Sequence, residues 1–275
     1  MKKFLSGLFT KIETRIIFYP MREFFDEMLP ELKGVMQEVF FDNKDGITLN
    51  AWYSPSKDGK PVILYCHGQA EHIAYLQKPY KVLTDNGYGV FAIEYRGHGK
   101  SKGIPSENGI YCDVESAVEF LTKQKGLKES DIVAWGRSLG GAVAADVATK
   151  YNLGGVVLES TFTTIKEASE YIVKSGCKHP IFGFKRKCLF RLAKFFPSKQ
   201  PFNTVGKIHK IKSPLLICHC KNDLIIDYRM AEKNAKIHGN ARLFIVDEGS
   251  HDYSDWAYDE VLDFLEGVYA ARVSS

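Results

Sequence analysis

Short apolar runs alternate with segments of helical periodicity over most of the chain. The apolar runs cover residues 62–66, 90–94, 132–135, 156–159, 215–220 and 243–246. Between most of them, apolar residues recur at helical spacing, over 72–86, 107–125, 139–150, 228–238 and 253–270. Short buried strands that alternate with helices predict a parallel sheet with right-handed crossover connections.

The sheet is predicted to begin with a hairpin. Residues 35–41 and 48–53 are strand-like, and Asn43-Lys44-Asp45-Gly46 joins them. Asp-Gly between two apolar runs is a hairpin signal, so antiparallel strands are expected at one edge. We therefore predict an α/β fold with a mostly parallel sheet of about eight strands, flanked by helices.

One interval breaks this alternation. Residues 160–213 stand where a single strand-to-helix unit is expected, but they are roughly twice too long for one. We predict that this insertion, which is rich in Phe and Lys, is a lid or cap. Within it, residues 184–196 have the pattern of a basic amphipathic helix, with Leu189, Leu192 and Phe196 on one face.

The N-terminus is predicted to form an amphipathic helix. Its apolar residues recur at helical spacing: Leu5, Leu8, Ile12, Ile16 and Tyr19. Lys11, Glu13 and Arg15 interrupt the apolar run and no small-residue cleavage site follows, which disfavours a signal peptide or a membrane span. The helix either docks on its own domain or lies on a membrane surface. We divide the chain into this helix and connector, residues 1–34, and one α/β domain, 35–275.

Composition narrows the class of protein. The chain has 275 residues, of which 45% are hydrophobic and 25% charged, and this excludes collagen-like and wholly disordered proteins. Its six cysteines form no Cys-x-x-Cys pair, so a reducing cytosol is expected, although Cys177 and Cys188 could pair in an oxidising compartment. Cys218-His219-Cys220 is interpreted as a buried strand, because no second ligand pair of matching spacing exists. We expect neither a metal nor a cofactor.

The formal net charge of +4 hides a strong asymmetry. Residues 1–22 hold five basic residues and one acidic residue, and residues 171–212 hold eleven basic residues and no acidic one. The rest of the chain therefore carries a net charge of −11. Each basic residue close to an anionic membrane contributes about 1 kcal/mol to binding, so a peripheral contact of these two segments with such a membrane is a partner hypothesis. Nucleic acid is not expected, because no recognition motif accompanies the charge.

The most informative stretch runs from 132 to 148. It reads as a strand, then Gly136-Arg137-Ser138-Leu139-Gly140, then a helix of small residues. Gly-x-Ser-x-Gly in this context predicts a nucleophile elbow, a sharp turn that exposes the serine at the end of a sheet. Gly136 and Gly140 are needed because side chains there would clash across the turn. Ser138 is therefore the predicted nucleophile.

A serine nucleophile needs a base, and the base needs an acid. His251 follows the last predicted strand, 113 residues after Ser138, and is the predicted base. Asp223 follows the penultimate strand and is the predicted acid, with Asp227 as the alternative. Asp252 is adjacent to His251 and lies in the wrong loop for this role.

The oxyanion of an acyl-transfer intermediate needs two backbone N–H donors. The first is predicted to be Leu139, directly after the nucleophile. The second is expected in the turn 66–70 after the third strand, where Gln69 is the preferred donor and Ala70 the alternative.

These residues give the sequence a family resemblance. It resembles the α/β-hydrolase superfamily, and more narrowly the membrane-associated α/β-hydrolase-domain serine hydrolases, whose relatives include protein depalmitoylases. Further matching stretches are residues 95–101 with Gly103 and 105–107, then 136–144 and 158–163. The resemblance covers roughly residues 35–265 and implies an α/β-hydrolase fold. Relatives usually carry a long apolar N-terminal anchor, whereas the N-terminus here is charged and amphipathic.

The sequence as a whole predicts a cofactor-free, cytoplasmic or peripherally membrane-associated serine hydrolase. Its expected substrates are acyl esters or thioesters, including lipid or S-acyl compounds. A serine peptidase acting on small peptides is the first alternative, and a non-catalytic membrane-binding module the second. The loop 96–101 either takes a phosphate or catalytic role or is a tight structural loop beside the nucleophile's strand.

Overall fold

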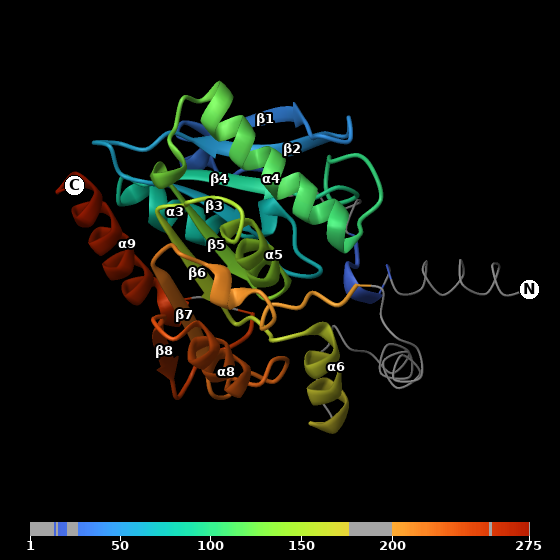
Figure 1. Ribbon diagram of the computed structural model, residues 1–275. Coiled ribbons are helices and arrows are strands. Elements are labelled where there is room, and N and C mark those ends of the chain that lie inside the picture. The colour runs from blue at the N-terminus through green and yellow to red at the C-terminus, as the bar shows by residue number, and fades with distance from the viewer. Residues whose placement is uncertain (1–13, 15, 21–26, 176–199, 253–254, 275) are drawn as a thin grey trace, which may run out of the picture.

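A single eight-stranded sheet organises the part of the chain that the computed structural model describes, which is residues 14, 16–20, 27–175, 200–252 and 255–274 (Figure 1). The strands are β1 (Gln37–Asp42), β2 (Thr48–Ser54), β3 (Val62–Cys66), β4 (Gly89–Glu94), β5 (Ile132–Arg137), β6 (Gly155–Glu159), β7 (Leu215–Cys220) and β8 (Arg242–Val246). Their order in the sheet is β1-β2-β4-β3-β5-β6-β7-β8. β2 pairs antiparallel with β1 and β4, and the remaining pairs are parallel. The predicted fold class is confirmed.

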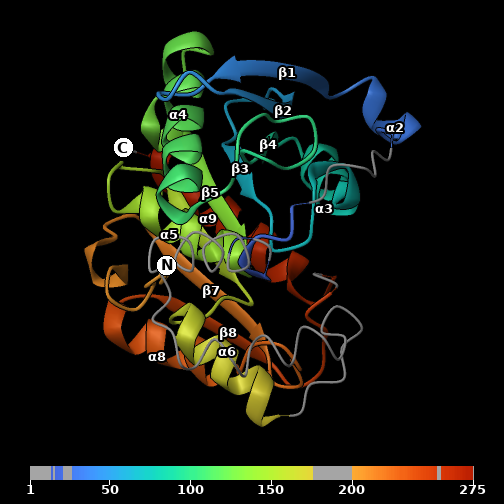
Figure 2. The ribbon, with the colours of Figure 1, turned by 90° about the vertical axis from the view of Figure 1, so that its right-hand side faces the viewer.

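Helices cover both faces of the sheet (Figure 2). The main helices are α3 (Gln77–Asp85), α4 (Glu107–Gln124), α5 (Leu139–Ala148), α6 (Ile165–Lys174), α8 (Arg229–His238) and α9 (Tyr258–Val273). Helices α4, α5 and α8 pack on one face, and α3 and α9 pack on the other. A short helix, α2 (Pro30–Lys33), precedes β1.

Alternation along the central strands produces two separate cores. Leu64 and Ala134 pack with α4, α5 and α8, whereas Tyr65 and Trp135 pack with α3 and α9. Strands β3 to β7 are buried throughout, as expected for parallel strands with helices on both faces.

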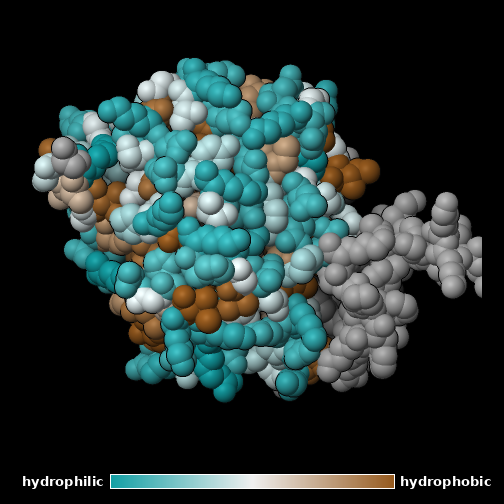
Figure 3. Space-filling model, in the orientation of Figure 1, coloured by the Kyte–Doolittle hydropathy of each residue, from teal (hydrophilic) through white to brown (hydrophobic). Residues whose placement is uncertain are grey.

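The molecular surface seen in Figure 3 is mostly hydrophilic, with hydrophobic residues in small groups.

The structure divides the helix predicted over 72–86. A 3₁₀ turn, Ile73–Tyr75, precedes α3, and Leu76 between them has non-helical backbone angles. Pro79 has no N–H to donate, so it is tolerated in the first turn of α3 but would disrupt a helix that continued through it. The C-terminal helix α9 begins at Tyr258 and extends three residues beyond the predicted end at 270.

Part of the N-terminal segment docks on the domain. Phe18 N–H donates to the carbonyl of Thr14 in a helical turn, and Ile16, Ile17 and Phe18 are buried. The other apolar residues of the predicted N-terminal helix, at 5, 8 and 12, lie outside the described residues. No helix among the described residues is long and apolar enough to cross a membrane.

The insertion is described at its two ends. Helix α6 occupies its first part, and a 3₁₀ turn, Ile208–Lys210, lies near its end. The amphipathic helix predicted over 184–196 lies outside the described residues, as do Cys177 and Cys188. The lid therefore remains a prediction.

Candidate active site

Ser138 occupies a strained turn between β5 and α5. Its φ of 52° and ψ of −117° lie in a region that L-residues rarely adopt. A Cβ on Gly136 would lie 2.2 Å from the carbonyl oxygen of Gly140, and one on Gly140 would lie 2.0 Å from the carbonyl oxygen of Cys66. Both glycines are therefore required for the close approach of this turn to itself and to β3.

Three side chains from different elements meet at this turn. His251 Nε2 lies 3.1 Å from Ser138 Oγ, and His251 Nδ1 lies 2.7 Å from Asp223 Oδ2. Asp223 follows β7 and His251 follows β8, so both come from the same edge of the sheet as Ser138. The contacts that run from Ser138 through His251 to Asp223 form the arrangement that can activate a serine hydroxyl as a nucleophile.

Asp223 is buried and held by four groups. Its Oδ1 accepts from the backbone N–H groups of Ile225 and Ile226, at 2.8 and 2.9 Å. Its Oδ2 faces His251 and also lies 3.2 Å from His219 Nε2. Burial alone would raise the pKa of Asp223, but the two imidazoles hold that pKa well below its ordinary range. Asp223 is therefore an anion that fixes the imidazole of His251.

The alternative acid is engaged elsewhere. Asp227 binds the Arg229 guanidinium, with Oδ1 2.9 Å from Arg229 Nε. His219, which the sequence indicates only as a buried strand residue, contacts Asp223 and the Ile226 carbonyl through the same nitrogen. A hydrogen on Nε2 of His219 faces both of these acceptors.

Gln69 and Leu139 both line a small apolar pocket that contains Ser138. Leu139 is the first residue of α5, where backbone N–H groups have no partner within the helix. Gln69 lies in the loop after β3, in which Gly68 N–H donates to Glu71 at 2.6 Å. The pocket has a volume of about 50 Å³. Its lining consists of Ile17, Gln69, Ser138, Leu139, Phe162, Ile165, Ala168, Ser169, Ile172, Ile225 and Ile226.

A buried guanidinium ties together the loops around the site. Arg137 pairs with Glu71 of the loop after β3, and its Nε lies 3.4 Å from Glu159 at the end of β6. It also donates to the backbone carbonyl of His251. One side chain therefore links the nucleophile's strand, the loop of the predicted oxyanion donor and the loop of the predicted base. The sequence gives no signal for these contacts beyond the position of Arg137 in the motif.

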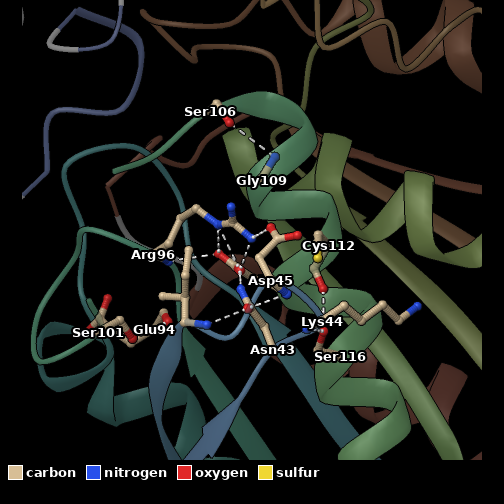
Figure 4. Close-up of polar contacts among 12 residues, drawn as sticks. Asn43, Lys44, Asp45, Glu94, Arg96, Ser101, Ser106, Gly109, Cys112 and Ser116 are labelled. Atoms are coloured by element: carbon tan, nitrogen blue, oxygen red, sulfur yellow. Dashed lines mark hydrogen bonds and ion pairs between the residues drawn. The ribbon is translucent and has the colours of Figure 1, made fainter. Parts of the chain in front are cut away.

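The loop after β4 is fastened by a second arginine (Figure 4). Arg96 Nε lies 2.9 Å from Asp113 on α4, and its Nη2 lies 2.8 Å from Asp45 in the β1–β2 turn. Asn43 donates to the same Asp113 carboxylate at 2.6 Å. These contacts engage the Arg96 guanidinium and support the structural interpretation of this loop over a phosphate-binding one.

The described part of the chain contains no candidate metal site. No group of three or more His, Cys, Asp or Glu side chains there is placed to hold a metal ion. The described cysteines, at 66, 112, 218 and 220, are free thiols.

Comparisons with known proteins agree with this architecture. A family model described as serine aminopeptidase, S33 (Hydrolase_4) matches residues 57–205. An α/β-hydrolase domain-containing protein of Arabidopsis thaliana, WAV2, is 30% identical over 84% of this chain and 77% of its own length. The lysophosphatidylserine lipase ABHD12 of Xenopus tropicalis is 28% identical over 87% of this chain and 69% of its own. Among solved structures, a Pyrococcus furiosus esterase superposes with a TM-score of 0.76 at 19% identity, covering 93% of this chain and 98% of the esterase.

Proposed function

The chain belongs to the α/β-hydrolase family, and from this premise we propose that it is a serine hydrolase that cleaves carboxylic ester or thioester bonds. The observation that carries the proposal is the 3.1 Å contact between His251 Nε2 and Ser138 Oγ on a strained turn. A strained backbone costs stability, so its occurrence at a serine beside a pocket supports a functional role for that serine.

In the proposed acylation step, Ser138 Oγ attacks the carbonyl carbon of the substrate while His251 Nε2 takes the hydroxyl proton. Asp223 stabilises the imidazolium that forms, through the contact to Nδ1 at 2.7 Å. The N–H groups of Leu139 and Gln69 stabilise the negative carbonyl oxygen of the tetrahedral intermediate. The bond to the alcohol or thiol then breaks, and His251 gives its proton to that leaving group.

Deacylation repeats the sequence with water. His251 takes a proton from a water molecule, whose oxygen attacks the acyl carbon. The second tetrahedral intermediate collapses to the carboxylic acid and Ser138, which recovers its proton from His251. The net reaction consumes one water and needs no cofactor.

The composition of the pocket supports an acyl substrate. Apart from Ser138, Gln69 and Ser169, its lining residues are aliphatic or aromatic, and Phe162, Ile165 and Ile172 come from the segment after β6. The transfer of an aliphatic acyl chain from water to such walls is favourable, because it buries apolar surface. A small-molecule or lipid ester is accordingly the proposed substrate class, in line with the lipase and esterase names of two similar proteins.

The test is a panel of p-nitrophenyl acyl esters and acyl thioesters with purified protein. Hydrolysis is expected from the wild type and not from Ser138→Ala, His251→Ala or a mock preparation. Hydrolysis that survives Ser138→Ala at the wild-type rate would contradict the proposed nucleophile. No turnover of any ester or thioester by folded protein would contradict the proposed class.

A serine peptidase is the second candidate, because the matching family model is described as a serine aminopeptidase. The same arrangement of Ser138, His251 and Asp223 cleaves amides when the site binds an amine leaving group. Aminoacyl p-nitroanilides assayed beside the esters separate the two functions. A higher kcat/KM for the anilides would reverse our ranking.

A further inference from the structure

The N-terminal segment Ile16–Phe18 is held against the candidate active site by its backbone. The Gln69 side-chain amide donates to the carbonyl oxygens of Ile16 and Ile17, the latter at 2.6 Å. His98 Nε2 lies 3.2 Å from the carbonyl oxygen of Phe18. The segment is therefore bound by the same loop that carries the proposed oxyanion donor.

Side chains fix the segment as well. The Phe18 ring is fully buried and packs edge-on against Phe202, with ring centroids 5.8 Å apart. In Figure 1 this segment, in blue, lies beside the orange stretch that contains residue 202. Ile16 and Ile17, whose carbonyl oxygens accept from Gln69, are only 9% and 6% exposed. The position of Ile17 is thus determined by contacts on both of its neighbours.

Ile17 is among the residues that line the pocket containing Ser138, whereas Ile16 is not. The pocket also contains Gln69 and Leu139, the proposed donors to the carbonyl oxygen, but the His251 ring does not line it. The leaving group must lie beside His251, which protonates it. The pocket therefore lies on the acyl side of the scissile bond.

We propose that Ile17 limits the length of the acyl chain that the site accepts. This inference rests on the proposed esterase function and adds a specificity-determining residue to it. The pocket is small, about 50 Å³, and Ile17, which is buried, forms part of its wall. A longer acyl chain would therefore need more room at this wall than the isoleucine leaves. The N-terminal segment is then a wall of the substrate site and not only a connector.

The experiment measures kcat/KM for butyryl and octanoyl p-nitrophenyl esters below their aggregation limit. Ile17→Ala enlarges the pocket and should raise the octanoyl-to-butyryl ratio by about tenfold, since a methylene in a tight apolar pocket changes kcat/KM by about that factor or more. Ile17→Phe should lower the same ratio. Ile17→Val, which removes one methyl group, replaces Ile17→Ala in this test if the alanine variant does not fold.

Ile16→Ala is the matched control, because Ile16 is the adjacent buried isoleucine and its side chain lies outside the pocket. Its octanoyl-to-butyryl ratio should equal that of the wild type. If the wild type hydrolyses esters but the Ile17 variants keep the wild-type ratio, the inference on Ile17 is overturned and the proposed function stands. If folded wild type hydrolyses no ester, the proposed function fails first and the inference falls with it.

Discussion

Arg137 donates a hydrogen bond to the backbone carbonyl of His251, which is 114 residues away in the chain. The same guanidinium pairs with Glu71 and faces Glu159, and all three side chains are buried. Arg137, which directly precedes the proposed nucleophile, therefore holds the loop that carries the proposed base. A loop held by one planar, multidentate group is sensitive to the loss of that group.

Arg137→Lys should lower kcat by about 10²-fold with a smaller change in KM. A lysine ammonium cannot reach Glu71, Glu159 and the His251 carbonyl together, and a displacement of about 1 Å at a catalytic group costs about that factor. The measurement is steady-state kinetics on a p-nitrophenyl ester, with unfolding in urea to follow stability.

Arg96→Lys is the control for this prediction, because Arg96 is also buried and paired with two aspartates but stands outside the site. Both variants should lose stability, while only Arg137→Lys loses kcat. Equal kcat values in the two folded variants would show that the Arg137 contacts are structural alone.

Acid should destabilise the fold partly through His98. Burial, with His67 adding to it, lowers the pKa of the His98 imidazole from 6.5 to about 4. The unfolded chain binds a proton at this residue below pH 6.5, but the folded chain binds it only below about 4. The stability that His98 contributes is therefore complete above pH 6.5 and is lost as the pH falls towards 4, by about 3 kcal/mol.

The check is urea unfolding of wild type and His98→Asn across this pH range. The variant should have a flatter dependence of its unfolding free energy on pH. His209→Asn, at an exposed position, should keep the wild-type slope. A His98→Asn curve parallel to the wild type would exclude His98 as a source of the acid sensitivity.

Two glycines should respond to alanine in opposite directions. Gly140→Ala forces a Cβ to within 2.0 Å of the Cys66 carbonyl oxygen, so it should cost about 3 kcal/mol or more of stability. Gly267 lies in α9, where an added Cβ would have nothing within 4 Å, so Gly267→Ala should gain about 0.5–1 kcal/mol. Thermal unfolding of both variants measures this contrast. A Gly140→Ala protein as stable as the wild type would contradict the close packing of the turn.

How far the sequence predicts this site depends on how local each signal is. Gly136, Ser138 and Gly140 belong to one short turn whose steric requirements are visible in the sequence. His251 and Asp223 could be predicted as base and acid because they follow predicted strands in the expected chain order. The strand runs likewise predicted the eight-stranded sheet, since continuous apolar stretches are typical of strands buried on both faces.

The remaining contacts depend on tertiary structure. Ile17 lies at the pocket through tertiary contacts of its segment, among them the one between its carbonyl oxygen and Gln69, 52 residues later. His219 has the sequence context of any residue in a buried strand, although it contacts Asp223. Apolar periodicity over 72–86 also conceals the break before α3. Such features arise from distances between elements that a single sequence does not specify.

Charge at the two basic segments predicts binding to anionic vesicles. Most of the basic residues in 1–22 and 171–212 lie outside the described residues, so this prediction rests on the sequence. Each should contribute about 1 kcal/mol near an anionic surface, and the attraction should weaken with salt. Sedimentation with phosphatidylserine-containing vesicles at low salt should exceed that with neutral vesicles, and Lys2→Glu with Lys3→Glu should reduce it. Equal sedimentation with both vesicle types would exclude this electrostatic contact.

Covalent labelling tests whether Ser138 is an activated nucleophile, on which the proposed reaction depends. A fluorophosphonate probe should label the folded wild type at Ser138, as mapped by mass spectrometry of the modified peptide. Ser169→Ala, which alters another serine of the same pocket, should still be labelled, whereas Ser138→Ala should not. Absence of labelling in folded wild type, or equal labelling of Ser138→Ala, would show that Ser138 is not the nucleophile.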